Sequence, residues 1–170
     1  RWYRFVLAYP DHLITKMIDR FGISKGETVL DPFCGTGTTL VECKKAGITS
    51  FGIDANPASV FMSKVKCNWE LNLDKIERLA KKVVSSMETV SRSLLYDEMP
   101  IFAGIHKNLD AIRKGILEAS RAGRYLVDSG MLERGWIDET PFYISIALLN
   151  EINSLSAEPE YTAFLKAALV

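Results

Sequence analysis

The sequence predicts an α/β fold over about the first 70 residues, followed by a largely α-helical second half. In the first part, two short strand-like runs, Thr28–Asp31 and residues 49–54, alternate with amphipathic helical segments. This alternation is the pattern of a parallel sheet covered by helices. After Asp54 the apolar residues recur mainly at helical spacing, and the only further strand-like run is a weak one at residues 124–128.

The elements of the first part follow in order. A helix is expected over residues 10–22, with Asp11 as its N-cap and a glycine as its stop. The run at residues 28–31 is β-branched and apolar, and residues 38–47 continue as a helix that is again closed by a glycine. After the second strand, residues 56–72 begin with an Asn-Pro pair and carry apolar side chains at helical spacing.

The second half contains four expected helices. Two of them lie at residues 73–95 and 106–123, separated by a break in the apolar pattern. The third is capped by Thr140, with Pro141 at its first helical position, and the fourth begins around Pro159 in the same way. The sequence has no internal repeat and no low-complexity tract.

Composition excludes several classes of protein. A chain of 170 residues with 48% apolar and 25% charged residues is ordinary for a globular protein. Its net charge of zero gives no global attraction to nucleic acid or to a membrane, and no apolar run is long enough for a membrane span. A membrane location is therefore not expected. The three cysteines lack metal-ligand spacing and are expected to be free thiols in a reducing cytoplasm, so no metal site is expected either.

The turn from the first strand into the next helix, within TVLDPFCGTGTTLVE, is the candidate ligand site. Backbone N–H groups of such a turn point toward the ligand crevice, and Gly35 and Gly37 remove side chains that would block a close approach. The glycines are too close together for a phosphate-binding P-loop, and no lysine follows them. A dinucleotide fingerprint is also incomplete, because Leu40 stands where the third glycine belongs.

Two acids at strand ends indicate which ligand fits. The carboxylate of Asp31, four residues before Gly35, would repel a pyrophosphate but suits a cationic ligand with an ammonium and a sulfonium, which is S-adenosyl-L-methionine. Asp54 ends the second run, where a carboxylate accepts both hydroxyls of a ribose. Since an NAD ribose would need the same acid, Asp31 is the residue that discriminates between the two ligands.

This segment resembles the cofactor-binding half of S-adenosylmethionine-dependent methyltransferases, and it is most similar to the amino-methylating DNA methyltransferases, which modify adenine N6 or cytosine N4. Their first motif commonly reads D-P-F-x-G-x-G-T-T, and its letters stand here as Asp31, Pro32, Phe33, Gly35, Gly37, Thr38 and Thr39. The stretch AYPDHLITKMIDRF is similar to the family segment that closes over the methionine part of the cofactor. The resemblance covers residues 3–70, about 40% of the chain.

The resemblance implies a partial Rossmann-like class I methyltransferase fold over residues 1–70 and a helical insertion or subdomain over residues 71–170. It implies S-adenosyl-L-methionine as the cofactor and nucleic acid, DNA in preference to RNA, as the partner of the full-length protein. The expected cofactor-binding residues are Tyr9, Pro10, Asp31, Pro32, Phe33, Gly35, Thr36, Gly37, Thr38, Thr39, Asp54, Ala55 and Asn56.

The motif that would bind the methyl-accepting amine is missing from this sequence. Amino-methylating enzymes carry a [DNS]-P-P-[YFW] tetrapeptide that binds the target amine and stacks on the extruded base. This chain has no Pro-Pro pair, and its weak look-alike is Thr140, Pro141, Phe142 and Tyr143, which a helix start explains. We therefore expect the remaining strands and the tetrapeptide beyond Val170, and this segment alone to be inactive.

Two other interpretations stay open at the level of sequence. The first is a methyltransferase that acts on bases of transfer RNA or another RNA, because a similar DPFCGTG loop occurs there. The second, from another class, is a non-catalytic helical interaction module with a vestigial cofactor pocket. The sequence gives neither the target base nor the oligomeric state.

Overall fold

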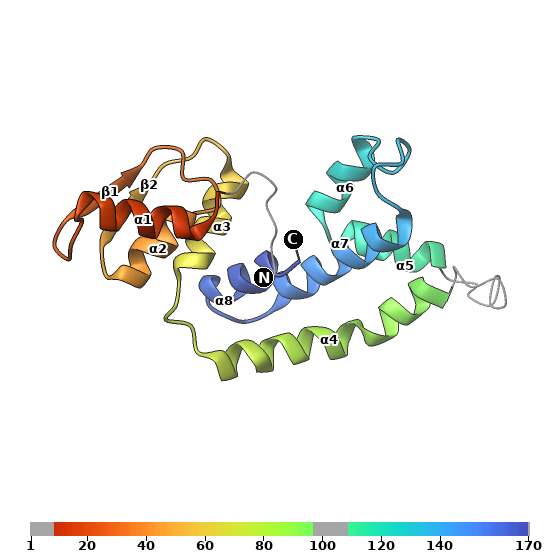
Figure 1. Cartoon of the computed structure of the whole chain (residues 1–170). Helices are drawn as coiled ribbons and strands as arrows, with labels where there is room; N and C mark the ends of the chain where they lie inside the picture. The colour runs from red at the N-terminus through yellow and green to blue at the C-terminus, as the bar shows by residue number, and fades with distance from the viewer. Residues whose placement is uncertain (1–8, 97–108, 170) are drawn as a thin grey trace. The chain divides into compact units, whose positions relative to one another are not determined.

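The computed structural model describes residues 9–96 and 109–169, and the chain divides into two compact units. The first unit is formed by residues up to Leu71 and contains the two strands, whereas the second is formed by residues 72–169 (Figure 1). In the described part of the second unit, the regular elements are all helices.

The first unit contains a parallel β–α–β arrangement. Its elements are α1 (Asp11–Phe21), β1 (Thr28–Asp31), α2 (Thr38–Ala46), β2 (Thr49–Gly52) and α3 (Pro57–Cys67). The two strands pair in parallel, with Leu30 opposite Phe51. Parallel neighbours need a crossover, and α2 supplies it. The expected α/β class with a parallel strand pair is therefore confirmed.

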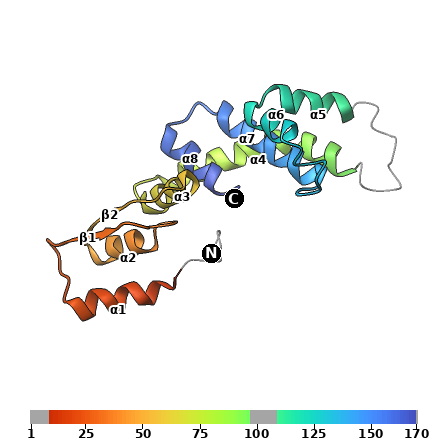
Figure 2. The ribbon, with the colours of Figure 1, turned by 90° about the horizontal axis from the view of Figure 1, so that it is seen from above.

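Helices α1 and α2 lie on the same side of the strand pair (Figure 2). Between them is a small core of Ile18 from α1, Cys43 from α2 and Ile48, with Val29 of β1 packed against it. Because side chains alternate along a strand, Leu30 and its partner Phe51 point to the other face, where each is 61% exposed. Helices α1 and α2 thus cover one face of the sheet.

Several element boundaries differ from the sequence expectation. Pro10, with an extended backbone, is the N-cap of α1, so Asp11 is the first helical residue and its carboxylate accepts the N–H of His12. Strand β2 ends at Gly52 instead of Asp54, because the residues after it turn toward the loop that follows β1. Helix α3 ends at Cys67 instead of residue 72, since Asn68 is already extended.

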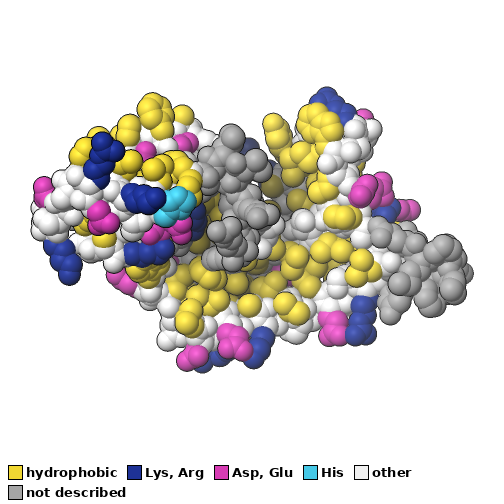
Figure 3. Space-filling view, in the orientation of Figure 1, with side chains coloured by type: hydrophobic (Ala, Val, Ile, Leu, Met, Phe, Trp, Pro, Cys, Tyr) yellow, Lys and Arg dark blue, Asp and Glu magenta, His cyan; other side chains and the backbone are white. Residues whose placement is uncertain are grey.

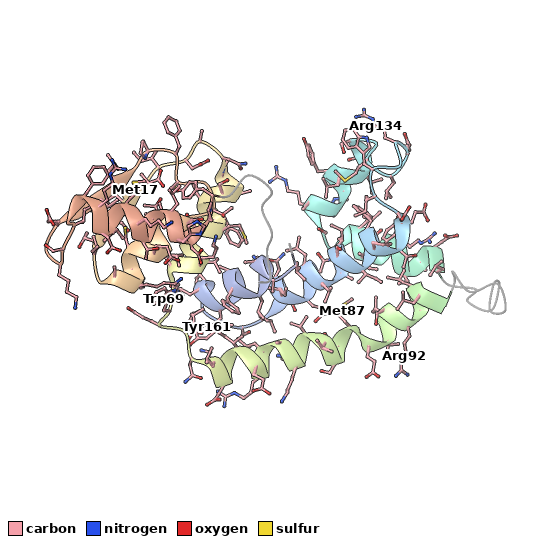
Figure 4. All side chains as sticks on the ribbon, in the orientation of Figure 1. Met17, Trp69, Met87, Arg92, Arg134 and Tyr161 are labelled. Atoms are coloured by element: carbon pink, nitrogen blue, oxygen red, sulfur yellow. The ribbon has the colours of Figure 1, made fainter. Side chains whose placement is uncertain are left out.

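The second unit is a cluster of helices around α7. Its elements are α4 (Leu73–Tyr96), α5 (Leu109–Glu118), α6 (Arg121–Asp128), α7 (Glu139–Ser154) and α8 (Pro159–Ala167). Helix α7 packs against α4, α5 and α8, and its Phe142 and Ile152 are each only 2% exposed. Met87 of α4 points into this core, whereas Arg92 points away from it (Figure 4).

Charged side chains line the outer surface of α4, as Figure 3 shows. Two of the ion pairs there, Lys81–Glu77 and Arg92–Glu88, join residues four apart in the helix. Helix α4 therefore has the apolar and charged faces that its sequence pattern predicts. Among the described residues, no helix combines the length and the apolarity needed to cross a membrane.

Three expectations for the second unit were wrong or incomplete. The helix expected at 106–123 is interrupted: α5 ends at Glu118, and the hydroxyl of Ser120 caps α6 by accepting the N–H of Gly123 at 3.0 Å. Residues 106–108 lie outside the described residues. The weak strand at 124–128 is part of α6, because this cap begins a helix there. Helix α7 begins at Glu139 with Asp138 as its cap, so Thr140 and Pro141 lie within its first turn.

Candidate functional site

The loop from β1 to α2 is joined to the segment that follows β2 by backbone hydrogen bonds. The N–H of Ile53 donates to the carbonyl of Asp31, and the N–H of Cys34 donates to the carbonyl of Ile53, both at 2.9 Å. Within the loop, the N–H of Gly37 donates to the carbonyl of Cys34 at 2.8 Å. The two segments at the carboxyl ends of the strands therefore form one connected structure.

Asp54 is bound to this structure through both carboxylate oxygens. Its Oδ2 accepts the N–H of Gly35 at 2.9 Å, and its Oδ1 accepts the N–H of Asn56 at 2.8 Å. The side chain of Asn56 in turn accepts the N–H of Ala58 at 2.9 Å and caps α3. Because a carboxylate oxygen can accept more than one hydrogen bond, Asp54 can keep these bonds and still receive hydroxyl donors from a ligand.

Asp31 is surrounded by three donors. Its Oδ1 accepts the N–H of Phe33 at 3.0 Å, while its Oδ2 lies 2.5 Å from the hydroxyl of Thr39 and 2.8 Å from that of Tyr9. The two hydroxyl oxygens are also only 2.6 Å apart. Three oxygens thus share two hydroxyl protons, which fixes Tyr9 over the end of β1.

These bonds keep Asp31 charged. Partial burial by itself would raise the pKa of this carboxyl, but the hydrogen bonds from Thr39, Tyr9 and the N–H of Phe33 outweigh that effect, and the net pKa is below the ordinary value. Burial also raises the pKa of Tyr9, so its hydroxyl keeps its proton at neutral pH. The site therefore presents a negative charge at the end of β1.

The two glycines of the loop have different surroundings. At Gly37, with φ of 85°, a Cβ would lie 2.7 Å from the Cβ of Ser63, so this glycine is needed for α2 to pack against α3. At Gly35, with φ of 52°, no atom lies within 4 Å of the position of a Cβ. The open space beside the loop is therefore at Gly35, and the role of Gly37 includes packing.

Exposure along the loop alternates sharply. Phe33 is 83% exposed, whereas Cys34 is only 4% exposed. The side chain of Cys34 packs against Gly52, where an added Cβ would lie only 2.8 Å from it. Burial, with Asp31 and Asp54 nearby, raises the pKa of the Cys34 thiol, which fits a small packed residue better than a nucleophile. Gly52 was not singled out by its sequence, although a glycine in a strand is a known sign of close approach.

The structure brings some of the predicted residues together and leaves others aside. Hydrogen bonds connect seven of them around the two acids: Tyr9, Asp31, Phe33, Gly35, Thr39, Asp54 and Asn56. Thr36 is buried and turned toward α3, where the ammonium of Lys66 donates to its hydroxyl at 3.0 Å. The other five form no side-chain hydrogen bond to the acids: Pro10, Pro32 and Ala55 are exposed, and Gly37 and Thr38 begin α2.

The weak acceptor-site look-alike lies in the core of the second unit. Thr140, Phe142 and Tyr143 are 5%, 2% and 8% exposed, and the two rings pack edge to face with centroids 5.3 Å apart. Pro141 is exposed on the first turn of α7. These aromatic side chains pack against other helices and offer no free ring face for a base, as expected of a helix start.

A hollow in the surface of the first unit lies apart from these acids. It has a volume of about 380 Å³ and is lined by Leu40, Lys44, Gly47, Ile48, Thr49, Ser50 and Cys67. It thus adjoins the beginning of β2, whereas the acids lie at the other ends of the strands. None of the predicted site residues lines it. Near its rim, Lys44 donates to the carbonyl of Cys67 and lies over the ring of Trp69, which is labelled in Figure 4.

The fold and the loop define a β–α–β unit with two carboxylates at the carboxyl ends of its strands. Residues 4–64, which contain this unit, match the N6/N4 methyltransferase family model described as DNA methylase. The resemblance to the amino-methylating DNA methyltransferases is therefore confirmed for this segment.

Curated relatives agree with the family match. The chain is 40% identical over 83 residues to Type II methyltransferase M.BsoBI of Geobacillus stearothermophilus and 30% identical over 93 residues to Type II methyltransferase M.MjaII of Methanocaldococcus jannaschii. These alignments include 48% and 53% of this chain but only 16% and 17% of those proteins. Type II methyltransferase M.HpaI of Haemophilus parainfluenzae is 28% identical over 102 residues, 58% of this chain and 32% of that protein. No solved structure matches the chain significantly.

Proposed function

We propose that residues 1–70 are the S-adenosyl-L-methionine-binding portion of a DNA methyltransferase that transfers a methyl group to an exocyclic amine of adenine or cytosine. The observation that carries the proposal is the pair of carboxylates, Asp31 and Asp54, which are bonded to the same loop at the carboxyl ends of the two parallel strands. The DNA methylase match over the same residues supports it independently.

Five residues of the site have a proposed role toward the cofactor. Asp54 would accept the ribose hydroxyls, and the ionised Asp31 would attract the ammonium. Phe33, whose ring is 83% exposed, would pack beside the cofactor, and the open space at Gly35 would admit it. Tyr9, already bonded to Asp31, would close the site from the segment before α1.

The bound cofactor would supply an electrophilic methyl group on a sulfonium. The residues described here would contribute position and electrostatics: they hold the donor, orient it and balance its charge. We propose that the fold is a partial Rossmann-like class I fold and that residues 71–170 form a helical insertion or subdomain. The residues that bind the target amine would then belong to the remainder of a longer protein, in line with the small share of the relatives that the chain spans.

DNA is the proposed partner in preference to RNA, because the matched family is described as DNA methylase and the relatives are named Type II methyltransferases. The two acids argue against a vestigial pocket, because both carboxylates still accept backbone N–H groups of the loop. The three free thiols fit a cytoplasmic protein.

Calorimetric titration of the 170-residue chain with S-adenosyl-L-methionine tests the proposal. We expect saturable binding to the wild type and at least about a tenfold loss of affinity in Asp54→Ala, because this variant lacks the two carboxylate oxygens that would accept the ribose hydroxyls. Asp19→Ala, which removes an exposed acid on α1, is the matched control and should bind like the wild type. No binding by the wild type, or equal affinity in Asp54→Ala, would overturn the cofactor assignment.

A further inference from the structure

Lys66 reaches from α3 to the centre of the loop. Its ammonium donates to the hydroxyl of Thr36 at 3.0 Å, and Thr36 stands between the two glycines with only 6% of its surface exposed. Lys66 itself is partly buried. Among the described residues, no carboxylate oxygen lies within ion-pair distance of its ammonium.

An ordinary helical role does not account for this placement. A lysine in the last turn of a helix favourably complements the helix dipole, but Lys64 serves that role equally from an exposed position on the same turn. Burial lowers the pKa of Lys66, which means that its charge is held at some cost in solvation. Within the described part of the chain, the ammonium of Lys66 donates only to a neutral hydroxyl, so this partly buried cation keeps donors and charge available for a further partner.

The charges around the loop are therefore mixed. Asp31 and Asp54 lie at the strand ends, and Lys66 adds a positive charge from the side of α3. Two acids alone would suit any cation. An amino-acid group that carries both an ammonium and a carboxylate needs a positive charge as well, because the acids would otherwise repel its carboxylate.

We propose that Lys66 is a positioning and specificity residue of this loop: it fixes Thr36, and its positive charge selects a methyl donor that retains the free α-carboxylate of its methionine part. This inference rests on the proposed function. It assigns to Lys66 the discrimination between two sulfonium nucleosides that differ only in that carboxylate.

The test compares S-adenosyl-L-methionine with its decarboxylated form by calorimetry on the 170-residue chain. We expect the wild type to bind the carboxylate-bearing ligand at least about tenfold more tightly. In Lys66→Met this preference should disappear through weaker binding of S-adenosyl-L-methionine, with little change for the decarboxylated ligand. Lys66→Arg should restore most of the preference, and Lys64→Met, the matched control, should bind both ligands like the wild type.

Each outcome has a distinct meaning. If the wild type binds both ligands equally well, the inference is overturned. This comparison needs no variant, so it holds even if Lys66→Met fails to fold. If Lys66→Met weakens both ligands by the same factor, Lys66 only holds the loop, and the charge selection is wrong. If the wild type binds neither ligand, it is the proposed function that fails.

Discussion

The carboxylate of Asp54 accepts the backbone N–H of Gly35 at 2.9 Å across nineteen residues of sequence. Its second oxygen accepts the N–H of Asn56, so one side chain connects the loop after β1 with the beginning of α3. The acid that is proposed to bind the ribose is therefore also a structural part of the loop. The shape of the loop and the proposed binding of a nucleoside depend on the same carboxylate.

The two loop glycines should respond differently to the same substitution. Gly37→Ala places a Cβ 2.7 Å from that of Ser63 in a left-handed backbone, and we expect it to cost about 3 kcal/mol or more of stability. Gly35→Ala meets no atom and should cost only about 1 kcal/mol, the strain of its positive φ. Urea unfolding of both variants measures the difference.

The double variant Gly37→Ala/Ser63→Gly provides the control for the steric argument. Removing the Cβ of Ser63 should recover part of the loss, although a glycine within α3 costs about 1 kcal/mol itself. If Gly35→Ala proved as destabilising as Gly37→Ala, the packing role assigned to Gly37 would be wrong.

Asp31 should make stability depend on acid pH. Its folded pKa lies below the ordinary value of 3.8 that applies to the unfolded chain. The ionised group therefore contributes stability that is fully present above that ordinary value and is lost as the pH falls through the lower, folded pKa. Unfolding free energies measured between neutral pH and about pH 2 should decline over this window.

Asp31→Asn is the comparison for this pH dependence, because the amide cannot ionise. Its stability should be lower than that of the wild type at neutral pH, and the two curves should converge at the acid end. Parallel curves over the whole range would contradict the assignment of the acid-sensitive contribution to Asp31.

Tyr9→Phe removes the hydroxyl that lies 2.8 Å from Asp31 and 2.6 Å from Thr39. We expect a loss of about 1 kcal/mol in stability and a rise in the pKa of Asp31, which loses one of its stabilising donors. Carboxyl titration by NMR detects the pKa change. Tyr125→Phe, at an exposed ring on α6, is the control and should leave the Asp31 titration unchanged.

The sequence predicted the first unit well where local signals decide the structure. The left-handed glycines at 22 and 47 end α1 and α2, and the Asn-Pro pair begins α3, as the patterns indicate. Asp31 ends β1 as expected, whereas Asp54 lies two residues beyond the end of β2. Where signals compete, the prediction failed: Thr140 and Pro141 favour a helix start, but α7 begins at Glu139, with Asp138 in an extended conformation as its N-cap.

Contacts between distant residues could not be read from sequence. Tyr9 and Thr39 are 30 residues apart, as are Thr36 and Lys66, and no local pattern indicates that these side chains meet. Propensity was also overridden at residues 124–128, whose β-branched and aromatic side chains favour a strand. The cap at Ser120 begins a helix there, which then packs on α5.

The second unit offers a test of helix packing in a matched pair of glycines. Gly123 of α6 lies so close to α7 that a Cβ would meet the Cγ2 methyl of Ile146 at 2.9 Å, whereas Gly115 of α5 is exposed with open space around it. Gly123→Ala should therefore destabilise the unit by about 1–3 kcal/mol, since Ile146 is buried and stiff. Gly115→Ala should stabilise it by about 0.5–1 kcal/mol, because alanine is the better helix former. Thermal or urea unfolding gives both values, and shifts of the same sign would show that α6 does not pack on α7 as closely as described.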